Sequence, residues 1–264
     1  MNKVPLSAFV ITYNEEDRLA KCLESLYKWV DDVVVVDSGS TDNTVKIAEK
    51  YGARVFTHPF KGYGQQKRFA EDQCKHKWLF NLDADEFMSP ALSQEIIALF
   101  TTGNIETYKS YHIKRQEILL EQEKPSRFAV TSTWLRLYHK DFARFQDCAA
   151  HDYVIVEHGK TGTLKNVFYH KSLRNWHHAI EKLNNYSDVL AQVAFAKGQK
   201  PSLAKFLLTP PLYLLKVYFL KRYFLQGLPG FFHSCSYVIL RQMKYIKTLE
   251  LFYKARRENQ EKQE

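Results

Sequence analysis

The stretch VVVVDSGSTDNT, residues 33–44, carries the pattern that decides the fold class. Four consecutive valines that end at Asp37 predict a strand buried on both faces, as the strands of a parallel sheet are. The small polar residues that follow predict a loop, and the apolar residues between 45 and 51 then recur at helical spacing. The stretch therefore predicts a buried strand, a polar turn and a helix, in that order.

The same alternation of strand and helix extends over the first hundred residues. Apolar spacing predicts a helix over 19–30, and the segment GYGQQKRFAEDQC indicates a glycine loop that leads into a helix. Ser89 followed by Pro90 predicts the N-terminus of another helix. Such alternation predicts a parallel sheet with helices on both faces, which binds its ligands beyond the carboxyl ends of the strands. The further strands are predicted at 7–12, 53–58 and 78–83.

After about residue 105 the pattern changes to shorter, mixed strands, and from about residue 173 it is helical. We therefore predict an α/β region in two parts, 1–105 and 106–172, followed by a helical extension over 173–264. Within this extension, the aromatic and basic residues 203–247 fit either packed core helices or an element that lies in the surface of an anionic membrane. None of it is expected to have the length and apolar composition of a membrane span, because glycines and prolines interrupt its uncharged part.

The amino-acid composition limits which partners and which cellular compartment are expected. The chain has 38 Lys and Arg against 29 Asp and Glu, a net charge of +9, which favours nucleic acid, an anionic membrane surface or a phosphorylated substrate. The basic residues are scattered and no nucleic-acid recognition motif is present, so no nucleic acid is expected as a partner. The four cysteines are far apart, which fits neither a metal motif nor a disulfide framework and favours the cytoplasm.

The segment NLDADEF, residues 81–87, places three carboxylates close together at the end of a predicted strand. Like charges at this spacing are costly unless a cation relieves them. Alternate residues of an extended strand share a side, so we expect Asp83 and Asp85 to face one crevice, where their oxygens suit Mg²⁺ or Mn²⁺. The alternative is a loop of three solvated acids. Polar residues at two other strand ends, at 12–15 and at Asp37, are expected to meet this segment at the same edge.

Four segments taken in order, VITYNEEDRLAKCLESL, VVVVDSGSTDNT, GYGQQKRFA and LDADEFMSPAL, resemble glycosyltransferase family 2. More narrowly, they are similar to the bacterial lipopolysaccharide-core β-1,4-glucosyltransferase type. The resemblance is dense over residues 5–100 and thinner beyond, with echoes at AAHDYV and YHKSLRNW. It implies a GT-A type fold, in which a parallel or mixed sheet is flanked by helices, and an inverting transfer in a single displacement.

The resemblance also implies roles for single residues. Asp83 approaches the ribose, and Asp85 binds the Mg²⁺ or Mn²⁺ that bridges the diphosphate. His170 matches a late histidine that contacts the metal or the diphosphate. Where the subgroup has His-Glu, this chain has His151–Asp152, so Asp152 is the expected general base. The residues expected around the nucleotide sugar are Thr12, Tyr13, Asn14, Glu15, Asp37, Gly64, Lys67, Asp83, Ala84 and Asp85.

The implied function is transfer of a hexose, with glucose from UDP-glucose as the first candidate. The acceptor is a glycan or glycolipid such as the lipopolysaccharide core, and the enzyme is expected at the inner face of the cytoplasmic membrane. The segment RFAVTSTW departs from the family pattern and leaves the acceptor open. Two other classes also stay open: another metal-dependent nucleotidyl or phosphoryl transferase, and a non-enzymatic polyanion-binding protein. A dehydrogenase is disfavoured, because no GxGxxG follows the first strand.

Overall fold

The computed structural model describes residues 3–148 and 152–261. The chain divides into two compact units. The first comprises residues 1–117 and 131–172, and it holds all of the strands found in the described part of the chain. The second comprises residues 118–130 and 173–264 and is mainly helical.

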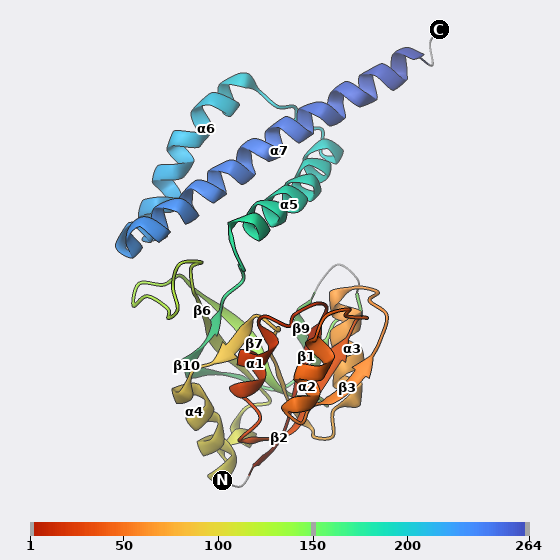
Figure 1. Cartoon of the computed structure of the whole chain (residues 1–264), viewed down its shortest axis with the longest axis vertical. Helices are drawn as coiled ribbons and strands as arrows, with labels where there is room; N and C mark the ends of the chain where they lie inside the picture. Colours follow the sequence, from red (N-terminus) through yellow and green to blue (C-terminus); the bar gives the residue numbers. More distant parts are fainter. Residues whose placement is uncertain (1–2, 149–151, 262–264) are drawn as a thin grey trace. The chain divides into compact units, whose positions relative to one another are not determined.

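The first unit is built on a mixed sheet of eight strands in the order β3-β2-β1-β4-β7-β6-β10-β5 (Figure 1). The first four strands of this order run parallel, whereas β7 is antiparallel to both of its neighbours. β10 lies parallel to β6 and antiparallel to β5, and β8 and β9 form a separate antiparallel pair. The strands are β1 (Val4–Thr12), β2 (Val30–Asp37), β3 (Arg54–Thr57), β4 (Trp78–Asn81), β5 (Glu86–Met88), β6 (Ser110–Glu117), β7 (Thr131–His139), β8 (Ala143–Phe145), β9 (Val154–Val156) and β10 (Thr161–His170).

Helices cover both faces of this sheet, and the valines of β2 show why. Val33 and Val35 enter the hydrophobic cluster that contains residues of α1, α2 and α4, whereas Val34 and Val36 enter a second cluster with α3. The predicted burial on both faces is therefore confirmed, and with it the α/β class with a helical C-terminal extension. The helices of the first unit are α1 (Leu19–Glu24), α2 (Thr44–Lys50), α3 (Tyr63–Gln73), α4 (Pro90–Thr101) and the 3₁₀ helix η1 (Asn104–Thr107).

Several element boundaries differ from the predicted ones. The first helix ends at Glu24 rather than near residue 30, because Val30 already pairs with Val4 in the sheet. The predicted glycine loop is shorter, since α3 begins at Tyr63 and takes in the residues after it. β4 ends at Asn81, two residues early. By contrast, the predicted cap of α4 is confirmed, because the Ser89 hydroxyl accepts a hydrogen bond from the amide of Leu92.

The second unit consists of helices that pack along one another. α5 packs against α7, where the rings of Phe195 and Phe252 lie 4.8 Å apart and Lys247 Nζ lies 2.7 Å from Asp188 Oδ1. α6 also contacts α7. The elements are α5 (Trp176–Ala196), α6 (Leu203–Leu215), the π-helix η2 (Lys216–Leu220), the 3₁₀ helix η3 (Tyr223–Gln226) and α7 (Gly227–Glu261).

α6 differs from the other long helices, because none of its residues, all of which the structure describes, is buried. Its leucines point largely into solvent, and Leu203, Leu207 and Leu212 are among the most exposed apolar side chains. Together with η2 it forms the segment Leu203–Leu220, which by length and composition alone could cross a membrane. The expectation that no part of the extension has that length and composition is therefore wrong, since the interrupting glycines all lie beyond residue 220.

Candidate active site

The carboxyl ends of β1, β2 and β4 meet at one edge of the sheet, as expected for parallel strands. Thr12 and Asp37 are direct neighbours in the β1–β2 register, and the Thr12 hydroxyl donates to Asp37 Oδ1 over 3.1 Å. The segment after β4 joins them, because Arg18 Nη1 lies 3.5 Å from Asp85 Oδ2. Polar residues that are far apart in the sequence are therefore gathered in one place.

Asp37 shapes the loop that follows β2. Its side chain is 2% exposed, and Oδ2 accepts hydrogen bonds from the amides of Gly39 and Ser40 over 2.9 and 2.8 Å. Asn14 has a left-handed backbone with φ 53°, and its Oδ1 accepts from the amide of Thr41. The two acceptors therefore tie the loops after β1 and β2 together, and the carboxylate of Asp37 is occupied by its own loop.

Of the other residues at the end of the first strand, Tyr13 is exposed to solvent and Glu15 forms an ion pair. Tyr13 is 59% exposed and lies at the rim of the loop. Glu15 pairs with Arg18, whose Nη2 lies 2.6 Å from Glu15 Oε2, and the Glu15 amide donates to Thr44 Oγ1. Because Arg18 also reaches Asp85, this ion pair links the first strand end to the acidic segment.

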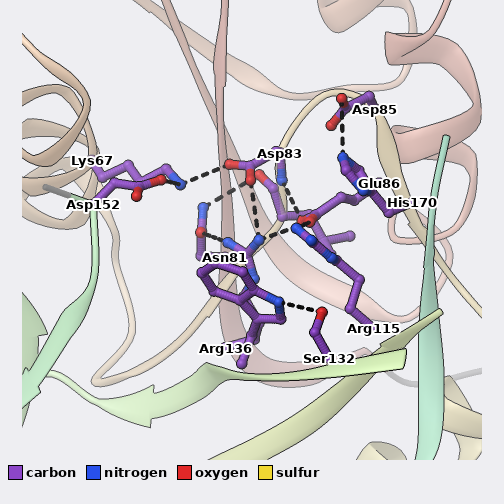
Figure 2. A network of polar contacts seen from close by, with 12 residues as sticks. Lys67, Asn81, Asp83, Asp85, Glu86, Arg115, Ser132, Arg136, Asp152 and His170 are labelled. Atoms are coloured by element: carbon purple, nitrogen blue, oxygen red, sulfur yellow. Dashed lines mark hydrogen bonds and ion pairs between the residues drawn. The ribbon is translucent and has the colours of Figure 1, made fainter. Parts of the chain in front are cut away.

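Asp83 and Asp85 point to different places, which corrects the expectation that they share one side (Figure 2). The alternation rule holds only in an extended strand. Here the strand has ended, and the segment turns back on itself: Glu86 N donates to the carbonyl of Asp83, and Asp83 N donates to Glu86 Oε2 over 2.9 Å. Ala84 is buried in this turn.

Asp83 lies between two cations. Lys67 Nζ is 2.8 Å from Asp83 Oδ1, and Arg136 Nη2 donates to Oδ2 over 3.0 Å. Burial raises the pKa of Asp83, but the charges of Lys67 and Arg136 outweigh it and hold that pKa well below its usual range. The carboxylate of Asp83 is therefore ionised and already paired.

Arg136 and Glu86 complete this network and were missed by the sequence analysis as site residues. Arg136 Nη2 also lies 2.8 Å from Glu86 Oε1, and Arg115 Nη1 lies 3.7 Å from the same oxygen. Burial and the neighbouring Asp83 raise the pKa of Glu86 to about 7, although Arg136 opposes the rise. Glu86 was visible in the acidic segment, but no sequence signal singles out Arg136 on strand β7.

Asp85 lies beside His170 on the neighbouring part of the edge (Figure 2). Asp85 Oδ2 is 3.4 Å from His170 Nε2, and His170 Nδ1 is 2.7 Å from Glu117 Oε2. Burial lowers the pKa of His170, but the hydrogen bonds that it donates to Asp85 and Glu117 outweigh this effect and raise that pKa to about 9. The carboxylate and the imidazole predicted as metal ligands thus lie together.

The carboxylate oxygens of this pair suit a hard divalent cation, and the imidazole can join them only after it loses the proton that its raised pKa retains. Neighbouring ligands of an octahedral ion with bonds near 2.1 Å are about 3 Å apart, close to the observed oxygen–nitrogen spacing. A carboxylate on the far nitrogen of a histidine is the usual support of a metal-bound imidazole, and Glu117 occupies that position. Among residues 3–148 and 152–261, no three His, Cys, Asp or Glu side chains gather to hold an ion, so any ion here needs ligands from substrate or water.

Gly64 and Lys67 lie inside helix α3, which corrects the expected placement on a loop along the nucleotide. Both residues are buried, and Lys67 is 1% exposed. Its ammonium bridges two acids, because Nζ lies 2.8 Å from Asp83 Oδ1 and 3.1 Å from Asp152 Oδ2. A lysine taken out of water needs such partners, and the network supplies them.

Asp152 lies on the far side of Lys67 from the acidic turn (Figure 2). Its side chain is 45% exposed, and only Oδ2 is held by the lysine. His151, its predicted companion, lies outside the described residues. Asp152 is therefore a half-exposed acid anchored at the edge of the site.

A parallel half-sheet that gathers paired acids at its carboxyl edge, joined to mixed strands that add a histidine and a further acid, defines a GT-A type glycosyltransferase architecture. The chain belongs to glycosyl transferase family 2, whose sequence profile matches residues 7–158. The predicted enzyme class is therefore confirmed, and the two alternative classes are set aside.

Relatives extend the similarity over most of the chain. It is 38% identical over 261 residues to an uncharacterized glycosyltransferase of Rickettsia conorii, covering 95% of this chain and 92% of the relative. It is 32% identical over 240 residues to the lipopolysaccharide core biosynthesis glycosyltransferase LpsC of Rhizobium meliloti, covering 89% and 88%. The structure of S. aureus TarS 1-349 in complex with UDP-GlcNAc is a weaker match, with a TM-score of 0.48 and 16% identity over 97% of this chain and 92% of that one.

Proposed function

We propose that this glycosyltransferase moves a hexose, with glucose as the first candidate, from a UDP-sugar to a lipopolysaccharide-type glycan with inversion at the anomeric carbon. LpsC, named for lipopolysaccharide core biosynthesis, supports the acceptor class. The observation that carries the proposal is the separation of two acids at one edge: Asp85 lies beside His170, whereas Asp152 lies apart on Lys67. An inverting displacement needs these two functions in different places.

The nucleotide binds over the loops after β1 and β2. Asp37 and Asn14 act through the loops that they hold in shape, because their side chains accept hydrogen bonds from loop amides. Tyr13 is exposed at the rim and offers a ring for the base to stack on. Asp83, kept ionised by its two cations, presents the ribose with an acceptor.

Asp85 would hold a Mg²⁺ or Mn²⁺ ion, His170 would join it after losing its proton, and Glu117 orients the imidazole. When bound, such an ion neutralises the charge of a departing diphosphate. Arg18, 3.5 Å from Asp85, keeps that carboxylate in place. The remaining ligands come from the substrate and from water, as is usual for Mg²⁺.

Asp152 is the general base. Its Oδ2 is fixed by the buried ammonium of Lys67, which leaves Oδ1 to accept the proton of the attacking hydroxyl. General-base assistance of this kind is worth about 10²–10⁴-fold in rate. Because Lys67 holds Asp152 at one end and Asp83 at the other, it fixes the distance between the base and the donor side of the site.

The second unit brings the enzyme to an anionic membrane surface, where a glycolipid acceptor is found. Residues 189–249 contain nine Lys and Arg and no Asp or Glu, so the rest of the chain carries equal numbers of cations and acids. In the same segment α6 exposes its leucines. A helix with apolar and cationic side chains suits the interface between headgroups and acyl chains. The prolines at 210 and 211 within α6 favour a helix lying in that interface over a straight span.

A donor screen tests the transferase proposal. Wild-type protein is incubated with UDP-, GDP- and dTDP-sugars and Mn²⁺, and release of the nucleotide diphosphate is measured with and without truncated lipopolysaccharide core. We expect UDP-glucose to be turned over, faster with the acceptor, and EDTA to stop the reaction. Turnover that is unaffected by EDTA contradicts the metal assignment, and no turnover of any UDP-sugar contradicts the donor.

Flotation with vesicles tests the membrane proposal separately. We expect the protein to float with vesicles that contain phosphatidylglycerol, less with phosphatidylcholine alone, and less again at high salt, since screening weakens the attraction between surface charges. Equal recovery with the neutral and the anionic vesicles contradicts it.

A further inference from the structure

A pocket of ≈ 340 Å³ lies beside Asp152, and Arg136, which pairs with Asp83 and Glu86, also lines it. It is lined by residues of β6, β7, β8 and the segment 152–156, all of them in the first unit. Ligand pockets span about 300–1,000 Å³, so this one is at the small end and suits a single compact group. The proposed general base, Asp152, therefore lines a pocket of defined size.

Two polar atoms that belong to pocket residues are buried without a hydrogen-bond partner in the described part of the chain. They are Nδ1 of His112 and Nε of Arg136. Arg136 is 4% exposed, and its other nitrogens are used by Asn81, Asp83 and Glu86. Both atoms have almost no accessible surface, so the protein covers them, and the ionisable side chain that a ligand meets in the pocket is Asp152.

The charges around the pocket are already balanced. Arg136 faces Asp83 and Glu86, and Asp152 faces Lys67. A phosphate group would require a lysine or arginine that has no acidic partner. Among the described residues, the lining contains no such lysine or arginine. The pocket therefore suits hydroxyl groups better than an anion.

The apolar part of the lining is aromatic and held in place. Phe145 is buried at the base, and Tyr153 is half exposed. Trp134 is fixed by a 2.8 Å hydrogen bond from Nε1 to Ser132 Oγ. Aromatic faces carry a negative potential that attracts polarised C–H groups, and the faces of a sugar ring present such groups.

We propose that this pocket receives one uncharged sugar unit of the acceptor, with its reactive hydroxyl toward Asp152, and that His112, Trp134 and Tyr153 determine which sugar fits. The assignment of this site to the acceptor rests on the proposed function. Asp152 meets the hydroxyl, the aromatic wall meets the ring, and the balanced charges exclude a phosphorylated unit at this position.

The experiment fills the pocket by a substitution that changes no residue of the network around Asp83. Thr133 is an exposed residue of β7 that lines the pocket, so Thr133→Trp puts a large ring into it. Thr131→Trp is the matched control, because Thr131 is exposed on the same strand but outside the lining. Binding is measured by saturation-transfer NMR with methyl glucoside, a methyl heptoside and methyl glucoside 6-phosphate, and thermal melting checks that both variants are folded.

We expect wild type and Thr131→Trp to saturate a neutral glycoside, and Thr133→Trp to give a signal at least tenfold weaker. The phosphorylated glycoside is expected to bind no better than its neutral form. The proposal is overturned if no neutral glycoside binds, if the two tryptophan variants behave alike, or if the phosphorylated probe binds best. Because this measurement needs no turnover, it is independent of the donor screen, whose failure would count against the proposed function instead.

Discussion

Charged residues are arranged in opposite ways at the carboxyl edge of the first unit and in residues 189–249 of the second unit. At the edge, each acid of the network meets a cation within the first unit: Asp83 meets Lys67 and Arg136, and Asp85 meets Arg18. In residues 189–249 nine cations have no acid among them, and apolar side chains stand in solvent.

The difference separates two uses of charged residues. Where charges are buried, the structure must neutralise them internally, because a charge out of water is costly unless it is paired. Where they are exposed and of one sign, they attract an oppositely charged surface over about a Debye length. The buried, paired charges fix the positions of the residues proposed for catalysis. The exposed charges of one sign favour association with an oppositely charged surface. Variants of each region test whether the two uses are separate.

The largest effect is expected at the acid that is proposed to hold the metal. Asp85→Asn removes a charged ligand whose contribution at the diphosphate is several kcal/mol, so turnover of UDP-glucose should fall by more than about 10³-fold. Asp141→Asn is the matched control, since Asp141 forms an exposed pair with Lys77 and should leave turnover unchanged. Nucleotide release measured with Mn²⁺ decides the matter, and a loss below tenfold removes Asp85 from the metal site.

The next effect is expected at the base. Asp152→Asn keeps a side-chain oxygen for Lys67 but no longer accepts a proton, so kcat for transfer should fall about 10²–10⁴-fold. Calorimetric binding of UDP should stay close to that of wild type, because Asp152 lies on the far side of Lys67 from the acidic turn. An unchanged kcat would assign the base elsewhere.

A smaller effect is expected on membrane binding. Each basic residue near an anionic surface contributes about 1 kcal/mol, so reversing two of them in Lys205→Glu/Lys216→Glu should lower vesicle binding by more than tenfold. Both lysines are exposed, on α6 and η2. Lys46→Glu/Lys50→Glu makes the same change in charge on exposed residues of α2 in the first unit. If flotation falls equally in the two double variants, net charge rather than this segment is responsible.

The smallest effect is expected on stability, at a structural ion pair of the first unit. Burial raises the pKa of Asp32, but the hydrogen bond from Arg54 and the amide of Lys75 outweigh it and lower that pKa below 3.8. A lowered folded pKa adds stability above the unfolded pKa, and this stability is lost as the pH falls through the folded value.

Asp32→Asn should therefore lower the free energy of unfolding by about 1–2 kcal/mol at pH 7, and by less as the pH drops below about 4. Urea denaturation at several pH values measures this. A cost that stays constant down to pH 2 would show that packing, not charge, holds this residue.

Much of the fold and part of the site could be predicted from the sequence because those features are local. The valines before Asp37 specify a strand buried on both faces, and Ser89 with Pro90 specifies a helix start, through rules that span a few residues. The acidic segment at 83–86 and the polar strand ends at 12–15 were visible for the same reason. Their chain order also identified the family.

How these residues are used depends on contacts between elements that lie far apart in the sequence. Asp83 and Asp85 point in different directions because β4 ends at Asn81. The alternating acids in the sequence do not reveal where the strand ends. Arg136 became part of the site because β7 pairs with β4, and Lys67 became a bridge between two acids because α3 buries it beside them. The physical reason is that ion pairs form across long sequence separations, so they depend on where the backbone brings the charges and not on the residues beside them in the chain.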